Sequence, residues 1–249
     1  MTRVYAIGDV HGHLDQLHEA LARIAADRRA TGDPSAPVVQ IGDLVDRGPD
    51  SRGVVRFLMS ETARDPRLTV LRGNHDNMLA LFLGDSPARD PRLRPQFDYL
   101  HPRIGGRQAM ASWGVDPDLP EDQLHRQARA AVSAAERDFL ATLPLSCAFG
   151  DCLFVHAGIR PGVPLDRQDP SDLYWIRDEF LLDSRDHGPL VVHGHTPVDH
   201  ATHYGNRINL DSGAGYGRPI SAAVFENGQV WQLTPQGRQP LPQAAPGSA

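Results

Sequence analysis

Short apolar runs alternate with amphipathic stretches along the first third of the chain. The runs RVYAI (3–7), PVVQI (37–41) and LTVL (68–71) have the length of buried strands, and a glycine follows each within two residues. Between the first two runs, Leu14 and Leu21 belong to an apolar series with three- and four-residue steps, the spacing of one helix face. This alternation of strand, loop and helix is typical of an α/β core with parallel strands.

The alternation breaks over residues 84–120, which are rich in Pro, Arg, Asp and Gly. We interpret this stretch as an inserted, cap-like segment, and we expect one amphipathic helix over residues 121–142. The pattern predicts strands in the last third of the chain, over 144–149, 152–157, 189–193, 207–210, 220–225 and 229–233. Residues 236–249 are rich in Pro, Gln, Gly and Ala, which favours a flexible C-terminal tail behind one domain over residues 1–235.

Composition narrows the functional classes. The 249 residues carry a net charge of −6, so no nucleic-acid partner is expected. No apolar run has the roughly 18 residues of a membrane span, and the N-terminus lacks a secretory leader, so we expect no membrane association and a cytoplasmic location. All 25 basic residues are arginine, so any cationic side chain that binds phosphate must be arginine. Cys147 and Cys152 flank a predicted hairpin and are expected to be free thiols.

Polar clusters follow the predicted strands where they end. The first strand leads into GDVHG, the second into GDLVDRG and the third into RGNHD, and two later strands end in VHAG and VHGHTP. Because loops beyond the carboxyl ends of the strands form the crevice of an open α/β sheet, we expect these clusters to converge. They supply the candidate residues Asp9, His11, Asp43, Asp46, Arg47, Arg72, Asn74, His75, Asp76, His156, His193 and His195.

Each cluster alone has an ordinary structural explanation. A DxH loop is a common polar turn, Asn-His can begin a helix, and the helix dipole accounts for Asp76 at a helix start. Such explanations do not account for five clusters together. Two aspartates, one asparagine and three histidines are sufficient for two adjacent metal sites with one bridging carboxylate.

The five blocks resemble, in order, the signature blocks of the calcineurin-like metallophosphoesterases over roughly residues 3–230. They are most similar to the small bacterial and phage-type serine/threonine phosphatases of the phosphoprotein phosphatase family. The resemblance implies an α/β sandwich in which central mixed β-sheets are flanked by helices, with the cap-like segment inserted.

The resemblance also implies two divalent metal ions per chain. It assigns Asp9 and His11 to the first ion and makes Asp43 a bridge between both ions. The second ion would take Asn74, His156 and one histidine of the HGH block. Manganese is the expected metal, and iron, zinc or cobalt are also compatible with imidazole and carboxylate ligands.

The stretch 191–204 contains four histidines. Family blocks place the ligand directly after a glycine, so the resemblance selects His195 for the second ion. His193 is then expected to lie beside the site, and His200 and His203 are expected to face the solvent.

By the same resemblance, His75 is the general acid and Asp46 holds its imidazole. Arg47 would bind phosphate. In the phage-type enzymes a second phosphate-binding arginine follows a tryptophan, and YWIRDEF offers Arg177 at that place; the structural alternative is a surface arginine. The implied reaction is direct attack by a metal-bridging hydroxide, without a covalent intermediate.

The expected function is a metal-dependent hydrolase of phosphoserine and phosphothreonine in proteins or peptides, with phosphotyrosine as a further substrate. The alternative is a symmetrical bis(5'-nucleosyl)-tetraphosphatase or another small-molecule phosphoesterase. That group tends to lose the second acid of GDxxDRG, which this chain keeps as Asp46. A nuclease or cyclic phosphodiesterase stays open. A non-catalytic binding module on an inactive fold is disfavoured because every expected ligand and the acid are present.

Overall fold

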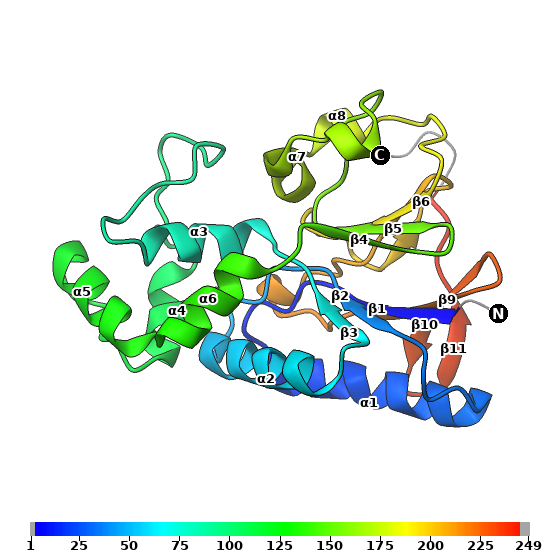
Figure 1. Cartoon of the computed structure of the whole chain (residues 1–249), viewed down its shortest axis with the longest axis horizontal. Helices are drawn as coiled ribbons and strands as arrows, with labels where there is room; N and C mark the ends of the chain where they lie inside the picture. The colour runs from blue at the N-terminus through cyan, green and yellow to red at the C-terminus, as the bar shows by residue number, and fades with distance from the viewer. Residues whose placement is uncertain (1–2, 245–249) are drawn as a thin grey trace.

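The computed structural model describes residues 3–244, and two stacked β-sheets form its centre (Figure 1). The six-stranded sheet has the order β11-β10-β9-β1-β2-β3. Its strands are β1 (Arg3–Ile7), β2 (Val38–Gln40), β3 (Leu68–Val70), β9 (Ala222–Glu226), β10 (Gln229–Thr234) and β11 (Gly237–Pro240). As predicted, β1, β2 and β3 are parallel, whereas β9 runs antiparallel to β1 and makes the sheet mixed.

The five-stranded sheet has the order β4-β5-β6-β8-β7. Its strands are β4 (Ser146–Phe149), β5 (Cys152–Val155), β6 (Leu190–His193), β7 (Thr202–His203) and β8 (Arg207–Asn209). The strands β5, β6 and β8 are parallel, while β4 forms the predicted hairpin with β5. Cys147 and Cys152 lie on this hairpin as free thiols.

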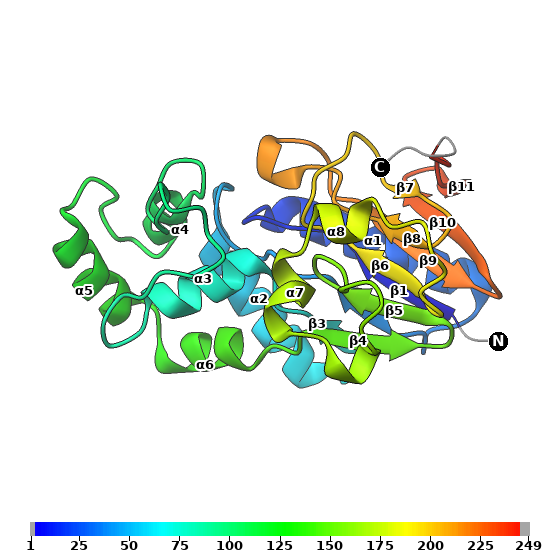
Figure 2. The same cartoon turned by 90° about the horizontal axis from the view of Figure 1, so that it is seen from above.

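Helices cover both outer faces of the sandwich. The helices α1 (Leu14–Thr31) and α2 (Ser51–Arg64) lie against the six-stranded sheet, and α7 (Pro170–Trp175) and α8 (Asp178–Leu181) lie over the other sheet (Figures 1 and 2). Successive side chains of β1 point to opposite faces of the sheet, so they belong to two different hydrophobic cores. Tyr5 and Ile7 are buried in the helix-side core, whereas Val4 and Ala6 pack between the sheets. Among residues 3–244 no helix is long and apolar enough to cross a membrane.

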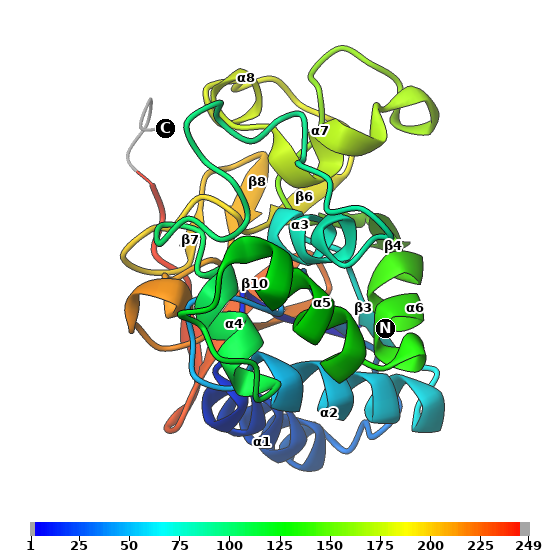
Figure 3. The same ribbon diagram turned by 90° about the vertical axis from the view of Figure 1, so that its left-hand side faces the viewer.

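The remaining helices form a lobe at one end of the sandwich (Figure 3). It contains α3 (Asn74–Phe82), α4 (Gly106–Ser112), α5 (Glu121–Ala131) and α6 (Ala134–Thr142), with the 84–105 loop running across it. The prediction of one helix over 121–142 is wrong, because the chain turns extended at Val132 and restarts at Ser133. The Ser133 hydroxyl caps α6 and the Glu136 carboxylate bonds back to the Ser133 N–H, a capping box that begins a new helix.

The predicted flexible tail is wrong for residues 237–244. The strand β11 pairs antiparallel with β10, and Leu241 is buried in the core between the sheets. The next residues continue beside β7, where the His203 N–H donates to the Pro242 carbonyl. The proline- and glutamine-rich composition of this segment does not predict a strand. An edge strand tolerates such residues, because it forms ladder hydrogen bonds on one side only. The rest of the predicted tail, residues 245–249, lies outside the described residues.

Truncation tests the structural role of this C-terminal segment. A chain ending at Gln236 loses the β11 ladder, the 2.7 Å ion pair between Arg238 and Asp27, and the buried Leu241. We expect the free energy of unfolding to fall by about 3 kcal/mol, and the melting temperature by roughly 6–12 °C. The control is a chain ending at Ala244, which should melt with the full-length protein. Equal melting of both truncations would show that the segment contributes nothing.

Candidate metal centre

The candidate ligands meet between the two sheets, beyond the carboxyl ends of β1, β2, β3, β5 and β6. All six are buried, with relative exposures of 0–5%. The six are Asp9, His11, Asp43, Asn74, His156 and His195. Convergence of loops from both sheets is the geometry expected of a site at the strand ends of an α/β fold.

Four atoms of one cluster point at a common centre. The Asn74 Oδ1 lies 2.7 Å from His195 Nδ1 and 3.1 Å from His156 Nε2. The same His156 nitrogen lies 3.3 Å from Asp43 Oδ1. Ligand atoms about 2.0–2.2 Å from a metal ion are themselves roughly 3 Å apart. The spacing of this cluster therefore fits one divalent cation.

The second cluster lies on the other side of the Asp43 carboxylate. Its Oδ2 is 3.5 Å from His11 Nε2, and His75 also offers a nitrogen within 4.8 Å of both. Asp9 lies on the same side of the site. Its Oδ2 accepts the His195 N–H at 3.1 Å, while its buried Oδ1 has no hydrogen-bond partner in the described part of the chain. A buried carboxylate oxygen without a partner is costly, and a cation supplies the missing partner. The donor set therefore fits a second divalent cation.

Backbone carbonyls fix the ligand histidines in one tautomer. The His156 Nδ1 lies 2.9 Å from the Ile41 carbonyl, and the His11 Nδ1 lies 2.9 Å from the Val45 carbonyl. In each ring Nδ1 therefore donates its proton, and the lone pair of Nε2 is directed into the cluster. Such outer hydrogen bonds orient and strengthen imidazole ligands in metal sites.

His75 is held by a chain of buried hydrogen bonds. Its Nδ1 lies 2.6 Å from Asp46 Oδ2, and the Tyr99 hydroxyl donates to Asp46 Oδ1 at 2.7 Å. On the other side of the ring, the Arg47 guanidinium donates to His75 Nε2 at 2.9 Å and to His11 Nε2 at 3.0 Å. The role of Tyr99 could not be predicted from the sequence, because this residue lies in the irregular 84–105 loop and no motif surrounds it.

Asp76 has a role that the helix dipole alone does not explain. Its carboxylate accepts the backbone N–H groups of Gly73, Asp43 and Leu44 at 2.8–2.9 Å. It therefore joins the start of α3 to the loop that carries the shared carboxylate. Close packing requires glycine at position 73, since a Cβ there would lie 2.1 Å from Asp43 Oδ1. Its place in RGNHD was the only sequence signal for Asp76.

Burial dominates the ionisation of the site. It raises the pKa of Asp43 to about 7, raises that of Asp46 well above its usual value, and lowers the pKa of His156 to about 4. For Asp9, the charges of Asp211 and Asp43 add to burial in raising the pKa. Neutral imidazole is the form that binds metal, and a cation favours the ionised carboxylates, so the electrostatics and the donor set agree.

Left-handed backbone conformations are concentrated in this site. Of the six non-glycine residues with positive φ among residues 3–244, five belong to the candidate site: His11, Asp43, Asp46, Arg47 and His195. Such conformations persist only where the surrounding structure enforces them, and they cluster at functional sites. The polar loops are therefore held in shape by the fold.

The structure separates the histidines of the 191–204 stretch. His195 reaches the cluster, while His193 is buried behind it, edge-on to Phe180 and 3.3 Å from the Arg207 guanidinium. His200 is exposed as expected. The expectation for His203 is wrong: it is half-buried in β7, because the C-terminal segment packs beside it. No motif predicted that partner.

Arg177 lies at the rim of the site, and within residues 3–244 its side chain forms no hydrogen bond or ion pair with the candidate ligands. Its guanidinium donates to the Thr196 hydroxyl at 3.0 Å. Burial lowers the Arg177 pKa, and the Asp43 charge opposes that effect, so the two groups are within electrostatic range. The preceding Trp175 packs edge-on against the His195 ring, which ties this loop to the cluster.

Known proteins share this architecture. Among relatives, the asymmetrical bis(5'-nucleosyl)-tetraphosphatase PrpE of Halalkalibacterium halodurans is 27% identical over 94% of each chain. Serine/threonine-protein phosphatase 1 of Salmonella typhimurium is 27% identical over 90% of this chain and 92% of its own. A cold-active protein tyrosine phosphatase has a fold similar to this one, with a TM-score of 0.66 at 19% identity over 96% of this chain and 78% of that one. A family model described as calcineurin-like phosphoesterase matches residues 2–217, and the chain belongs to that family.

Proposed function

We propose that the protein hydrolyses phosphoserine and phosphothreonine monoesters in proteins or peptides. The observation that carries the proposal is the buried pair of His75 and Asp46, 2.6 Å apart, with His75 Nε2 directed at the site. An alkoxide leaving group is strongly basic and needs a proton as the ester bond breaks. A nucleoside phosphate leaving group is far less basic. A general acid held in position, as His75 is by Asp46, therefore favours alkyl phosphomonoesters as substrates.

The metal ligands in this proposal are Asp9 and His11 on one side, Asn74, His156 and His195 on the other, with Asp43 shared between them. When bound, two divalent cations polarise phosphoryl oxygens and lower the pKa of a coordinated water. Manganese is the first metal to assay, followed by iron, zinc and cobalt.

Arg47 and Arg177 act in this proposal as phosphate-binding residues. Arg47 carries two N–H groups that now donate to His11 and His75. When phosphate oxygens take those hydrogen bonds, His75 Nε2 is free to take up a proton from water, and the imidazolium, held by Asp46, can pass that proton to the leaving oxygen. A guanidinium matches two phosphate oxygens at once, which supports its role beside a transferring phosphoryl group.

Hydrolysis of dinucleoside polyphosphates is the second candidate function. The sequence pointed to a symmetrical tetraphosphatase as the alternative, whereas the full-length PrpE relative is named asymmetrical. The Arg94 side chain supports this candidate, because it is exposed, makes no ion pair within residues 3–244 and lies within electrostatic range of Arg177. Further phosphates of such a substrate would find a cation there. Phosphorylated proteins as partners and a cytoplasmic location complete the leading proposal.

Replacing His75 separates its acid role from a metal-ligand role. His75→Asn should lower kcat for a phosphoserine peptide on the order of 10²–10⁴-fold, because the alkoxide loses its proton donor. The fall should be much smaller for p-nitrophenyl phosphate, whose leaving group needs little help. Metal analysis should still give two ions per chain. Loss of one ion, or an equal fall for both substrates, would assign His75 to the metal cluster instead.

The two neighbouring histidines provide a matched pair. His195→Ala removes a cluster nitrogen and should lower the bound metal from two ions to about one per chain, with activity lost. His193→Ala removes a buried ring behind the cluster, so stability should fall while both ions are retained. Elemental analysis and thermal melting of the two variants measure this. The reverse result would exchange the two assignments.

Asp76 is expected to act through Asp43. Asp76→Asn exchanges one acceptor oxygen for a donor and leaves a buried backbone N–H without a partner, which should cost about 1–3 kcal/mol in unfolding free energy. It should also weaken binding of both metal ions. The control is Asp50→Asn at the start of α2, where the side chain accepts one N–H from Gly53 and asparagine is an equally good cap. Equal metal affinity in both variants would contradict the positioning role.

A further inference from the structure

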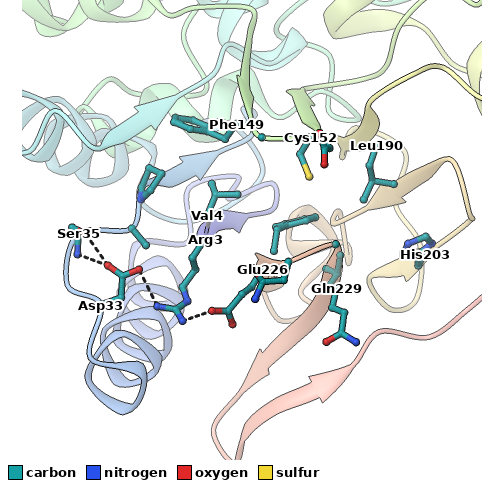
Figure 4. Close-up of a pocket in the computed structure, with 18 of the residues that line it drawn as sticks. Arg3, Val4, Asp33, Ser35, Phe149, Cys152, Leu190, His203, Glu226 and Gln229 are labelled. Atoms are coloured by element: carbon teal, nitrogen blue, oxygen red, sulfur yellow. Dashed lines mark hydrogen bonds and ion pairs between the residues drawn. The ribbon is translucent and has the colours of Figure 1, made fainter. Parts of the chain in front are cut away.

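Two of the cavities in the described part of the chain differ in what they can bind. The larger, about 800 Å³, lies at the other end of the sandwich and is lined by the first residues of β1, β5 and β6 (Figure 4). Its arginine, Arg3, is already paired with Asp33 and Glu226. With Asp151 also at its edge, this cavity is acidic and does not suit a phosphate compound.

The second cavity, about 500 Å³, adjoins the candidate metal centre. Its lining residues are Arg47, Pro102, Arg103, Gln108, Gly215 and Tyr216. Its size falls in the usual range of small-molecule sites, about 300–1,000 Å³. Arg47 belongs both to this cavity and to the candidate metal centre, because its guanidinium also contacts His11 and His75.

The position of His75 determines which part of a substrate this cavity receives. The general acid must face the leaving oxygen. One nitrogen of the Arg47 guanidinium lies 2.9 Å from His75 Nε2, and Arg47 also lines the cavity. The leaving group of a bound phosphate compound therefore extends towards this cavity.

Tyr216 gives the cavity an aromatic wall. Its side chain is 64% exposed, an unusual exposure for a large ring. The Arg47 guanidinium lies 5.1 Å from the ring centroid and fixes one face by a cation–π contact. The loop beneath the ring packs closely against the site, since a Cβ on Gly215 would lie 2.7 Å from the His11 ring. The exposed part of the Tyr216 ring is open to stacking by another planar group.

Arg103 and Gln108 supply polar groups on the same cavity. Within residues 3–244 neither side chain makes a hydrogen bond or ion pair, although the Arg103 guanidinium lies 5.9 Å from the Phe97 ring. Together they offer N–H donors and one amide oxygen. A heterocyclic base has donor and acceptor edges that use such groups, whereas the phenyl ring of phosphotyrosine has none.

We propose that this cavity is the subsite for the nucleoside on the leaving side of a nucleoside polyphosphate, with the base stacked on Tyr216 and its edge met by Gln108 and Arg103. The proposal rests on the second candidate function above. In that reaction water adds to phosphorus, the anhydride P–O bond breaks, and the nucleoside phosphate leaves with the electron pair.

A pair of non-hydrolysable ligands tests the subsite. Adenosine 5′-(α,β-methylene)diphosphate and methylenediphosphonate share the two phosphorus groups and differ by the adenosine. Titration calorimetry of the manganese-loaded protein should give roughly tenfold tighter binding of the adenosine ligand, as expected for one base stacked on one aromatic ring. Tyr216→Ala should reduce this preference to below about twofold, and Tyr216→Phe should keep it because the ring remains.

Three outcomes overturn the proposal. These are a wild-type protein without preference for the adenosine ligand, a Tyr216→Ala variant that keeps the preference, and failure of both ligands to bind, which also removes the phosphate site itself. A peptide with phosphonomethyl-phenylalanine provides the competing arm. If Tyr216→Ala weakens only this peptide, the cavity takes phosphotyrosine. Diadenosine tetraphosphate turnover is measured separately, so that its absence with an intact preference overturns the substrate class while supporting the subsite.

Discussion

The Asp43 carboxylate is shared by both candidate metal clusters, and the rest of the site depends on its position. One oxygen lies 3.3 Å from His156 and the other 3.5 Å from His11, so a shift of this group disturbs both clusters. Burial raises its pKa to about 7, which shows that the fold holds the carboxylate where water does not stabilise its charge. That desolvation leaves the carboxylate in need of positive charge, which divalent cations would supply.

Backbone contacts keep this group in place at the cost of local strain. Asp76 accepts the N–H groups of Asp43 and Leu44, and the absence of a side chain at Gly73 allows the two loops to touch. Asp43 itself has a φ of 53°, in the left-handed region that residues other than glycine rarely adopt. The folded sheets stabilise this conformation, since their parallel strands deliver the loops to one place.

Local pattern predicted the parallel core and the loops that carry the ligands, because both follow from short-range features. Apolar runs of four or five residues correspond to β1, β2 and β3, and the candidate ligands follow them directly. Long-range partners could not be predicted in the same way. Tyr99 reaches Asp46 across 53 residues, and β11 needs β10 to become a strand. The break of the 121–142 helix depends on one serine cap, which periodicity does not reveal.

In the two proposals, the acid and the cavity favour different substrates through different kinetic terms. A proton from His75 would matter most for a basic alkoxide and would raise the rate of the chemical step for phosphoserine. Stacking on Tyr216 would be present before and during the reaction, and would strengthen binding of a nucleotide without accelerating its cleavage. Arg47 contacts His75 and also lines the cavity, so the proposed acid and the proposed subsite share one neighbouring residue. The two proposals are therefore compatible in one site, with phosphoserine favoured in kcat and nucleotides favoured in KM.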